Sequence, residues 1–289
     1  MNISKFFVLG MIILSLLIIS GVEQCPQTGF GGGKTEASKY GVDFIPQQGF
    51  DRLTPGKTLN LGESFYVDIL LENYDKDPKI GQVCIRDDMD SAYGGILSTV
   101  CKPFNLPAAV YIDNKLDTSS SARVIFPEAE EYSYINLLAD IPAKLYVSIS
   151  YSQQSIISGA VSVPEPATEK ALTLQQFPAP VSVSVEKSVS SIGDQLKTNL
   201  KIGFTKQGNY NITTRDFKKE ALEFSSMLGT SILNCPEAAQ GIIEFKNTKF
   251  ISCSALLPRE QTTHPLIITL NYGVKLNKDF AFSIKKEAK

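Results

Sequence analysis

The chain has 289 residues, with 28 Lys and Arg against 30 Asp and Glu, and a formal net charge of −2. There is no basic excess to attract phosphate backbones, which argues against nucleic acid as a partner. The sequence has no Trp and a single His, His264, so it lacks the side chains of most imidazole general-base and multi-histidine metal centres. We therefore expect a non-enzymatic protein that holds no cofactor.

An uncharged apolar run over residues 6–22 follows Lys5 and precedes a Gly-rich spacer at residues 23–38. This arrangement is typical of a signal peptide or a membrane anchor, which we assign to residues 1–22. As a helix the run is roughly 26 Å long against a hydrocarbon core of ~30 Å, so cleavage and retention both stay open. Either outcome predicts an extracytoplasmic protein, secreted or anchored in the membrane through this helix.

Cys25 follows the apolar run closely and is a candidate for lipidation. A lipoprotein attachment site has a small residue directly before the cysteine, whereas Gln24 occupies that position here. The interpretation as an ordinary juxtamembrane thiol is therefore favoured over the lipid-bearing one.

Four further cysteines lie in the body of the chain: Cys84, Cys101, Cys235 and Cys253. Exported proteins form disulfides readily, and nearest-neighbour pairing predicts the bonds Cys84 to Cys101 and Cys235 to Cys253. Each bond closes a loop of under twenty residues, contributing about 3 kcal/mol in the chain-entropy model. Zinc is the alternative, but no two cysteines have the spacing of a zinc knuckle.

Alternation of apolar and polar residues dominates the rest of the sequence, as in Phe65, Val67, Ile69 and Leu71. This period of two predicts half-buried strands, so we expect an all-β fold. Four prolines between residues 164 and 180 indicate an interdomain linker. The predicted domains are therefore residues 39–163 and residues 181–286.

Residues 145–163 align without a gap with residues 266–284, sharing Leu, Tyr, Ala and Ser at four positions. The alignment indicates that the two domains are divergent copies, and we expect a terminal hairpin in each. One segment departs from the strand pattern: Phe217, Ala221, Phe224 and Leu228 recur at spacings of four, three and four, which predicts a short amphipathic helix over residues 216–228.

Three closely spaced carboxylates, Asp87, Asp88 and Asp90, are candidates for a calcium site because Ca²⁺ prefers oxygen ligands. Ala92 occupies the third EF-hand ligand position, so a solvated acidic turn is the favoured interpretation. Asn211 begins an Asn-Ile-Thr sequon and is a candidate for N-glycosylation. By analogy with other sandwiches, we expect binding residues in the segments 87–95 and 151–155.

The leader, the stretch LNLGESFYVDILLEN at residues 59–73 and the stretch PAKLYVSISY at residues 142–151 together resemble exported archaeal cell-surface proteins with immunoglobulin-like or CARDB-like β-sandwich domains. The resemblance implies two tandem sandwiches behind the N-terminal helix, with no catalytic residues. The Cys, Trp and Cys pattern of antibody domains is absent.

These observations predict a non-enzymatic surface protein that acts in adhesion, partner binding or envelope assembly, with a protein or glycan partner at the cell surface. One alternative is an exported carbohydrate-active enzyme, because glycoside hydrolysis needs only two carboxylates. A second alternative is a structural subunit of a pilus or surface lattice.

Overall fold

The computed structural model of the chain describes residues 40–113, 115–163, 170–238, 240–259 and 262–286. The segment Ser38–Lys289 forms one compact unit, and its described residues contain strands and two 3-10 turns but no α-helix. Among the described residues no helix has the length and apolar character that crossing a membrane requires. The predicted leader at residues 1–22 and the spacer at residues 23–38, with Cys25, lie outside the described residues.

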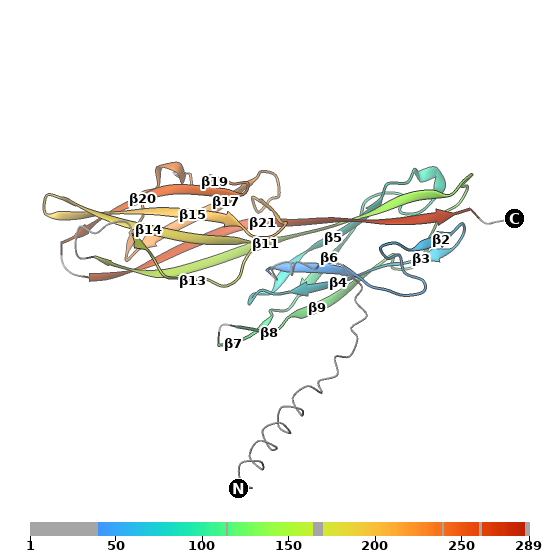
Figure 1. Cartoon of the computed structure of the whole chain (residues 1–289), viewed down its shortest axis with the longest axis horizontal. Helices are drawn as coiled ribbons and strands as arrows, with labels where there is room; N and C mark the ends of the chain where they lie inside the picture. The colour runs from blue at the N-terminus through green and yellow to red at the C-terminus, as the bar shows by residue number, and fades with distance from the viewer. Residues whose placement is uncertain (1–39, 114, 164–169, 239, 260–261, 287–289) are drawn as a thin grey trace, which may run out of the picture. The chain divides into compact units, whose positions relative to one another are not determined.

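Two long strands, β11 (Ile141–Val163) and β21 (Thr262–Lys285), organise the fold (Figure 1). The strands that precede β11 are β1 (Val42–Pro46), β2 (Thr58–Asn60), β3 (Ser64–Phe65), β4 (Val67–Asn73), β5 (Lys79–Asp87), β6 (Val100–Leu106), β7 (Val110–Ile112), β8 (Lys115–Thr118), β9 (Ser120–Phe126) and β10 (Tyr132–Ser133), with the 3-10 turn η1 (Ser91–Tyr93) after β5. Those between β11 and β21 are β12 (Lys170–Ala171), β13 (Leu174–Gln175), β14 (Val181–Ile192), β15 (Gln195–Lys206), β16 (Asn211–Thr213), β17 (Ala221–Leu228), β18 (Ser231–Ile232), β19 (Ile242–Glu244) and β20 (Thr248–Pro258), with η2 (Pro236–Ala238) after β18.

β11 and β21 pair antiparallel along the whole of β11, from Ile141 opposite Ile284 to Val163 opposite Thr262. β5 adds to the first half of β11, and β17 adds to the first half of β21. The order β18, β17, β21, β11, β5, β6 therefore forms one continuous sheet. Because the strands are antiparallel, the first half of each lies beside the second half of the other.

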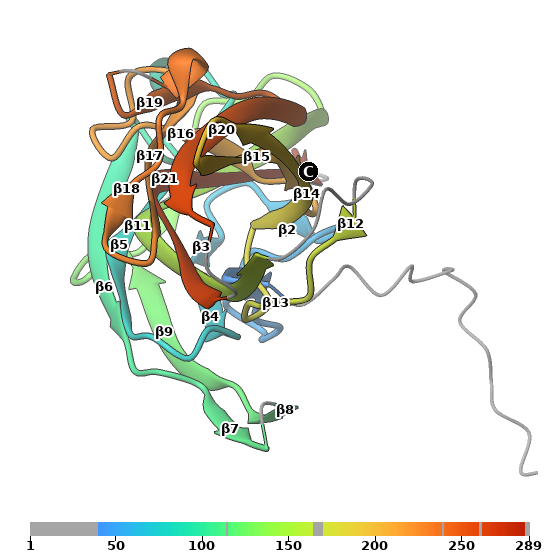
Figure 2. The same cartoon turned by 90° about the vertical axis from the view of Figure 1, so that its left-hand side faces the viewer.

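Two smaller sheets have the same plan, and their strands lie before β11 and between β11 and β21 in the sequence. β1, β4 and β9 pair antiparallel in that order. β14, β15 and β20 do the same, and Figure 2 shows them side by side. We call the first group, with β5, β6 and the ladder from Ile141 to Tyr151, the first lobe. The second group, with β17 and the ladder from Leu266 to Tyr272, is the second lobe. The result is a β-sandwich-like all-β fold.

Apolar side chains connect the small sheet of each lobe to the long sheet. In the first lobe, Phe44 of β1 meets Phe280 of β21 edge to face with ring centroids 6.3 Å apart. In the second lobe, Phe204 of β15 meets Phe224 of β17 in the same way at 5.7 Å. The Phe44 contact packs Phe280, a residue near the end of the chain, against the core of the first lobe, so this core closes only when β21 is in place.

The repeat in the sequence coincides with the strand pairing. The gapless alignment matches Ser152 with Gly273, and these two residues are also directly opposite each other in the ladder. The two strands are therefore related by a local twofold axis between Ser152 and Gly273, with the matched Tyr151 and Tyr272 beside it. Gly273 is required there because a Cβ atom at this position would lie 2.6 Å from the carbonyl oxygen of Thr214.

Two predictions from the sequence are wrong. Residues 145–163 and 266–284 are not hairpins, because each lies within one uninterrupted strand and the two strands pair with each other. Residues 216–228 do not form a helix, since β17 pairs with β21 from Glu223 to Leu228. The buried side chains of β17 alternate, and this tertiary pairing overrides the helical spacing.

The predicted domain limits, residues 39–163 and 181–286, stay predictions, as does the linker at residues 164–180. Strand pairing nevertheless crosses these limits, because the second half of β21 lies in the sheet of the first lobe. The described part of the linker is not a free tether. β12 pairs with β14 and β13 pairs with β11, which fixes this segment against the second lobe.

The disulfides join Cys84 to Cys101 and Cys235 to Cys253, the two pairs that the spacing predicts. Cys84 and Cys101 are directly opposite each other on β5 and β6. Cys253 lies on β20, and Cys235 follows the backbone bridge between Asn234 and Ser254. Two disulfides indicate an extracytoplasmic protein, because reducing compartments rarely maintain them.

Replacing the second disulfide, as Cys235→Ser with Cys253→Ser, is expected to lower the free energy of unfolding by about 3 kcal/mol, because the unfolded chain regains the freedom of an 18-residue closure. Urea denaturation without reductant measures this loss. Wild-type protein treated with a reductant provides the matched control and should lose at least as much stability. An unchanged urea midpoint in both samples would contradict the prediction.

Candidate binding site at the strand crossing

The three candidate calcium ligands have separate structural roles. The carboxylate of Asp87 is buried and accepts hydrogen bonds from the Tyr134 hydroxyl at 2.7 Å and the Ile96 backbone N–H at 2.9 Å. Asp88 accepts from a backbone N–H of β11, and Asp90 accepts from a backbone N–H of η1. Among the described residues, no group of three His, Cys, Asp or Glu side chains is placed to hold a metal ion.

Asn211, the candidate glycosylation site, is exposed at the start of β16. The hydroxyl of Thr213, the third residue of the sequon, is buried and donates to the carbonyl oxygens of Thr214 and Gly273. The folded structure thus presents the asparagine to solvent while the threonine supports the strand crossing. Glycosylation of Asn211 stays a prediction.

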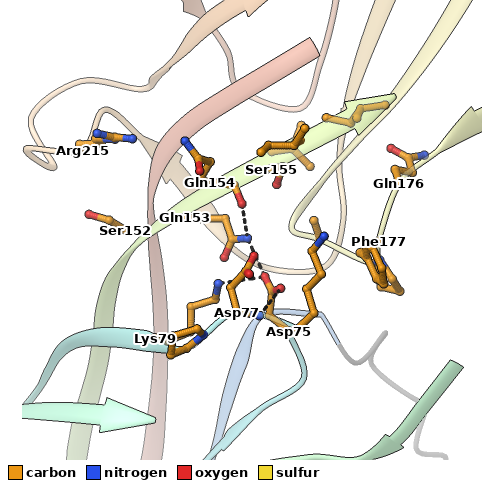
Figure 3. Close-up of a pocket in the computed structure, with 17 residues that line it drawn as sticks. Asp75, Asp77, Lys79, Ser152, Gln153, Gln154, Ser155, Gln176, Phe177 and Arg215 are labelled. Atoms are coloured by element: carbon orange, nitrogen blue, oxygen red, sulfur yellow. Dashed lines mark hydrogen bonds and ion pairs between the residues drawn. The ribbon is translucent and has the colours of Figure 1, made fainter. Parts of the chain in front are cut away.

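A cavity of about 400 Å³ opens beside the centre of the β11 strand, where the two lobes meet (Figure 3). Its walls come from the turn between β4 and β5, the middle of β11, the segment before β14, and the loop after β16. The lining residues are Asp75, Lys76, Asp77, Pro78, Lys79, Ser152, Gln153, Gln154, Ser155, Ile156, Ile157, Gln176, Phe177, Pro178, Ala179, Val181 and Arg215.

The floor of the cavity is a network of three buried polar side chains: Asp75, Lys79 and Gln153. Each is 3% exposed. The Asp75 carboxylate accepts from the Lys79 ammonium at 3.0 Å and from the Gln153 amide at 2.6 Å. It also accepts from the backbone N–H of Asp77 at 3.2 Å. A buried ion pair persists only when such additional hydrogen bonds compensate the loss of hydration, so this network fixes the turn before β5 against β11.

The rim of the cavity carries polar groups from β11 and from the loop after β16. The Gln154 amide donates to the Asn271 side-chain oxygen at 2.9 Å, and Arg215 donates to the same oxygen. Arg215 also lies 3.8 Å from the Glu223 carboxylate. Ser155 shares a hydrogen bond of 3.1 Å with the buried Tyr272 hydroxyl. Asn271 and Tyr272 of β21 thus hold rim side chains of β11 and of this loop in place.

Phe177 forms the wall opposite β11 (Figure 3). The Lys76 ammonium lies over its ring, 3.8 Å from the centroid, and the Tyr111 ring meets it edge to face at 5.5 Å. A cation over an aromatic face and a T-shaped ring pair are both favourable arrangements. Phe177 is therefore held in place, although it lies in the segment that the sequence suggested was a linker.

Two of the residues beside the twofold axis are fully buried tyrosines. The Tyr151 hydroxyl accepts from the Val42 backbone N–H at 3.0 Å, and burial raises the pKa of this hydroxyl well above its ordinary value. Burial also raises the pKa of Tyr272. Both hydroxyls stay protonated in the folded state and ionise more readily after unfolding. The free energy of unfolding therefore depends on pH through these two tyrosines.

The buried, protonated tyrosines make their full contribution to stability below about pH 10, where the tyrosines of the unfolded chain begin to ionise. Above that pH the unfolded state releases protons that the folded state retains, so the free energy of unfolding is expected to fall. Tyr151→Phe should make this alkaline decline shallower, while costing about 1–3 kcal/mol at neutral pH because the Val42 N–H loses its acceptor. Urea titrations between pH 8 and 11 test this. A decline as steep in the variant as in the wild type would contradict it.

Of the two segments in which we expect binding residues, one lines the cavity and the other does not. The segment 151–155 is not a loop but the centre of β11, and Ser152, Gln153, Gln154 and Ser155 from it line the cavity. The segment 87–95 contributes no lining residue. Asp75 and Lys79 are not among the predicted site residues, and the only signal for them in the sequence is a charged turn between two strands.

The fold defines a disulfide-bonded, β-sandwich-like protein. No protein-family model matches the chain, and no curated protein sequence matches it. The chain is similar to a solved structure of red sea bream transglutaminase at 8% identity and a TM-score of 0.22, covering 87% of this chain and 32% of that one. It is also similar to Escherichia coli alpha-2-macroglobulin activated by porcine elastase, at 10% identity and a TM-score of 0.12, covering 85% and 33%. The chain thus spans about a third of each of these proteins.

Proposed function

We propose that this chain is a non-enzymatic extracytoplasmic protein, membrane-tethered through its leader or secreted, in which two immunoglobulin-like sandwiches form a rigid scaffold for partner binding or envelope assembly. The observation that carries the proposal is the uninterrupted pairing of β11 with β21. A flexible tether would let two sandwiches move independently, whereas a shared ladder must break hydrogen bonds before they separate.

The immunoglobulin-like assignment is supported by the order of the strands. In such sandwiches of the constant type the first, second, fourth and fifth strands form one sheet, and the third, sixth and seventh form the other. In the first lobe the fourth strand, β6, pairs instead with β5 of the second sheet. The first lobe otherwise follows this plan with β1, β4 and β9 in one sheet, and with β5, β11 and β21 in the other. The second lobe follows it with β14, β15 and β20, and with β17, β21 and β11. The seventh strand of the first lobe is therefore the second half of β21, and the seventh strand of the second lobe is the second half of β11. Each lobe is completed by a strand that begins in the other lobe.

The carboxylates of the cavity support a binding role over hydrolysis. Glycoside hydrolysis needs one carboxyl group as acid and a second as base or nucleophile. The cavity is lined by Asp75 and Asp77, and the Asp75 carboxylate already accepts from Lys79 and Gln153 on the floor. Because of this bonding, the cavity offers Asp77 no second unbonded carboxylate to serve as its acid or nucleophile partner.

Labelling of intact host cells with a membrane-impermeant amine reagent, followed by intact mass of the extracted protein, tests the proposed location and state. We expect labelling without lysis, two disulfides, and a mass that shows whether residues 1–22 are retained. Labelling only after lysis, or four free thiols, would contradict the proposal. A screen of glycan substrates provides the activity test, and turnover that the variant Asp77→Asn abolishes would favour the enzyme alternative.

A further inference from the structure

The charges around the cavity balance one another. Lys79 is paired with Asp75 on the floor, and Arg215 lies within ion-pair distance of Glu223 at the rim. Lys76 and Asp77, which also line the cavity, have opposite charges and are adjacent in the turn before β5. A site that selects an anion or a cation presents an excess of the opposite charge, and this cavity has little excess of either sign. Its ligand is therefore expected to be uncharged.

The groups that remain available can both donate and accept hydrogen bonds. Ser152 presents a hydroxyl, and Gln154, which uses one amide N–H on Asn271, keeps a second N–H and its side-chain oxygen. Gln176 also lines the cavity, but both ends of its amide are bonded to the backbone of Val183. Among the described residues, the Asp77 carboxylate has no ion-pair or hydrogen-bond partner, so it adds a free acceptor. A ligand rich in hydroxyl groups matches such a surface, because each hydroxyl is itself a donor and an acceptor.

The aromatic wall and the size of the cavity limit the ligand further. Phe177 provides an aromatic ring opposite the polar side chains of β11, as Figure 3 shows, and the Lys76 ammonium covers one face of this ring. A volume of about 400 Å³ is at the small end of ligand-binding cavities. Apolar C–H faces and polar hydroxyl edges occur together in pyranose rings, and a cavity of this size accommodates one or two of them.

We propose that the cavity at the strand crossing binds a short, uncharged saccharide, with Gln154 and Asp77 as hydrogen-bonding residues and Phe177 as the aromatic wall beside a sugar ring. This inference rests on the proposed non-enzymatic function, because the saccharide is bound and not cleaved. The buried network of Asp75, Lys79 and Gln153 keeps the floor fixed, so the site is preformed. Preformed sites lose less entropy on binding, which suits a small ligand.

The test is an array of neutral and acidic glycans probed with the full chain in a zwitterionic detergent, because alkyl-glycoside detergents would compete for the site. The best neutral glycan is then titrated by calorimetry against Gln154→Ala and Asp77→Ala. Each variant should weaken binding about tenfold, the effect of losing one good hydrogen bond. Gln48→Ala, an exposed glutamine outside the cavity, is the matched control and should bind as the wild type does.

Binding of a neutral glycan that both cavity variants weaken, with thermal midpoints like that of the wild type, supports the proposal. No binding across the array, or binding that neither variant changes, overturns it. Binding confined to acidic glycans and lost in high salt also overturns it, since the ligand would then be recognised by charge. None of these outcomes bears on the surface-labelling result, so the scaffold function and the saccharide site can fail separately.

Discussion

A chain that ends after Tyr272 is expected to lose the cooperative folding of its first lobe. The missing segment is the second half of β21, which pairs with β11 from Ile141 to Tyr151 and carries the buried Phe282 and Ile284. Without it, β11 loses its pairing with β21 in the first lobe, and the core there is open to water. Near-UV circular dichroism and calorimetry measure the loss, which we expect as a smaller unfolding enthalpy and a broader transition.

A chain that ends after Lys285 is the matched control, because it retains all of β21, and it should unfold as the full chain does. A synthetic peptide of residues 273–285, added to the shortened chain, should restore part of the lost signal by strand addition. The prediction fails if the chain ending after Tyr272 keeps the full unfolding enthalpy, since the first lobe would then be complete without β21.

The second large effect is expected for Asp75→Ala, which should lower the free energy of unfolding by about 3–5 kcal/mol. The substitution leaves the Lys79 ammonium buried without its counter-charge and removes one of the two acceptors of the Gln153 amide. Asp77→Ala, two residues further along the same turn, changes an exposed carboxylate and should stay within about 0.5 kcal/mol of the wild type. Urea denaturation of both variants provides the comparison.

The double variant Asp75→Asn with Lys79→Met separates the unpaired charge from general damage to the turn. It keeps a side-chain acceptor for Gln153 and replaces the ammonium with an apolar group of similar length. We expect it to recover most of the loss caused by Asp75→Ala, because removing both charges of a buried pair costs far less than removing one. A double variant as unstable as Asp75→Ala would show that packing, not charge, holds this turn.

The strand content and the disulfides could be predicted from the sequence because both depend on local signals. The alternation around Val67 and Leu71 predicts β4. The short separations between the cysteines predict the two disulfides. The immunoglobulin-like resemblance agrees with the all-β fold, while its finer assignment rests on the strand order. None of these features requires knowledge of which strands pair over long distances.

The strand crossing could not be predicted in the same way. Most strands have about five or six residues, so an apolar pattern as long as that of residues 145–163 is read more naturally as two strands and a turn. Ser152 and Gly273 at its centre are also common turn residues. Only the pairing of β11 with β21 shows that the chain continues straight through both positions.

The helix prediction failed because Phe217, Ala221, Phe224 and Leu228 fit a helical period as well as they fit part of a strand. β17 buries Ala221, and from Leu222 onward its buried residues alternate: Leu222, Phe224, Ser226 and Leu228. The cavity was missed for a different reason. Asp75 and Gln153 are 78 positions apart, and nothing in either local pattern indicates that their side chains meet.

Hydrogen exchange of the full chain, read by mass spectrometry over residues 145–163 and 266–284, tests the shared ladder most directly. If β11 and β21 are continuous, the amides around Ser152 and Gly273 should exchange as slowly as those near Ile149 and Leu270, because they open only when the whole ladder opens. Rapid exchange confined to residues 150–155 and 271–275 would reveal a hinge between the lobes. That result would contradict the proposed rigid scaffold, in which the two lobes share one ladder.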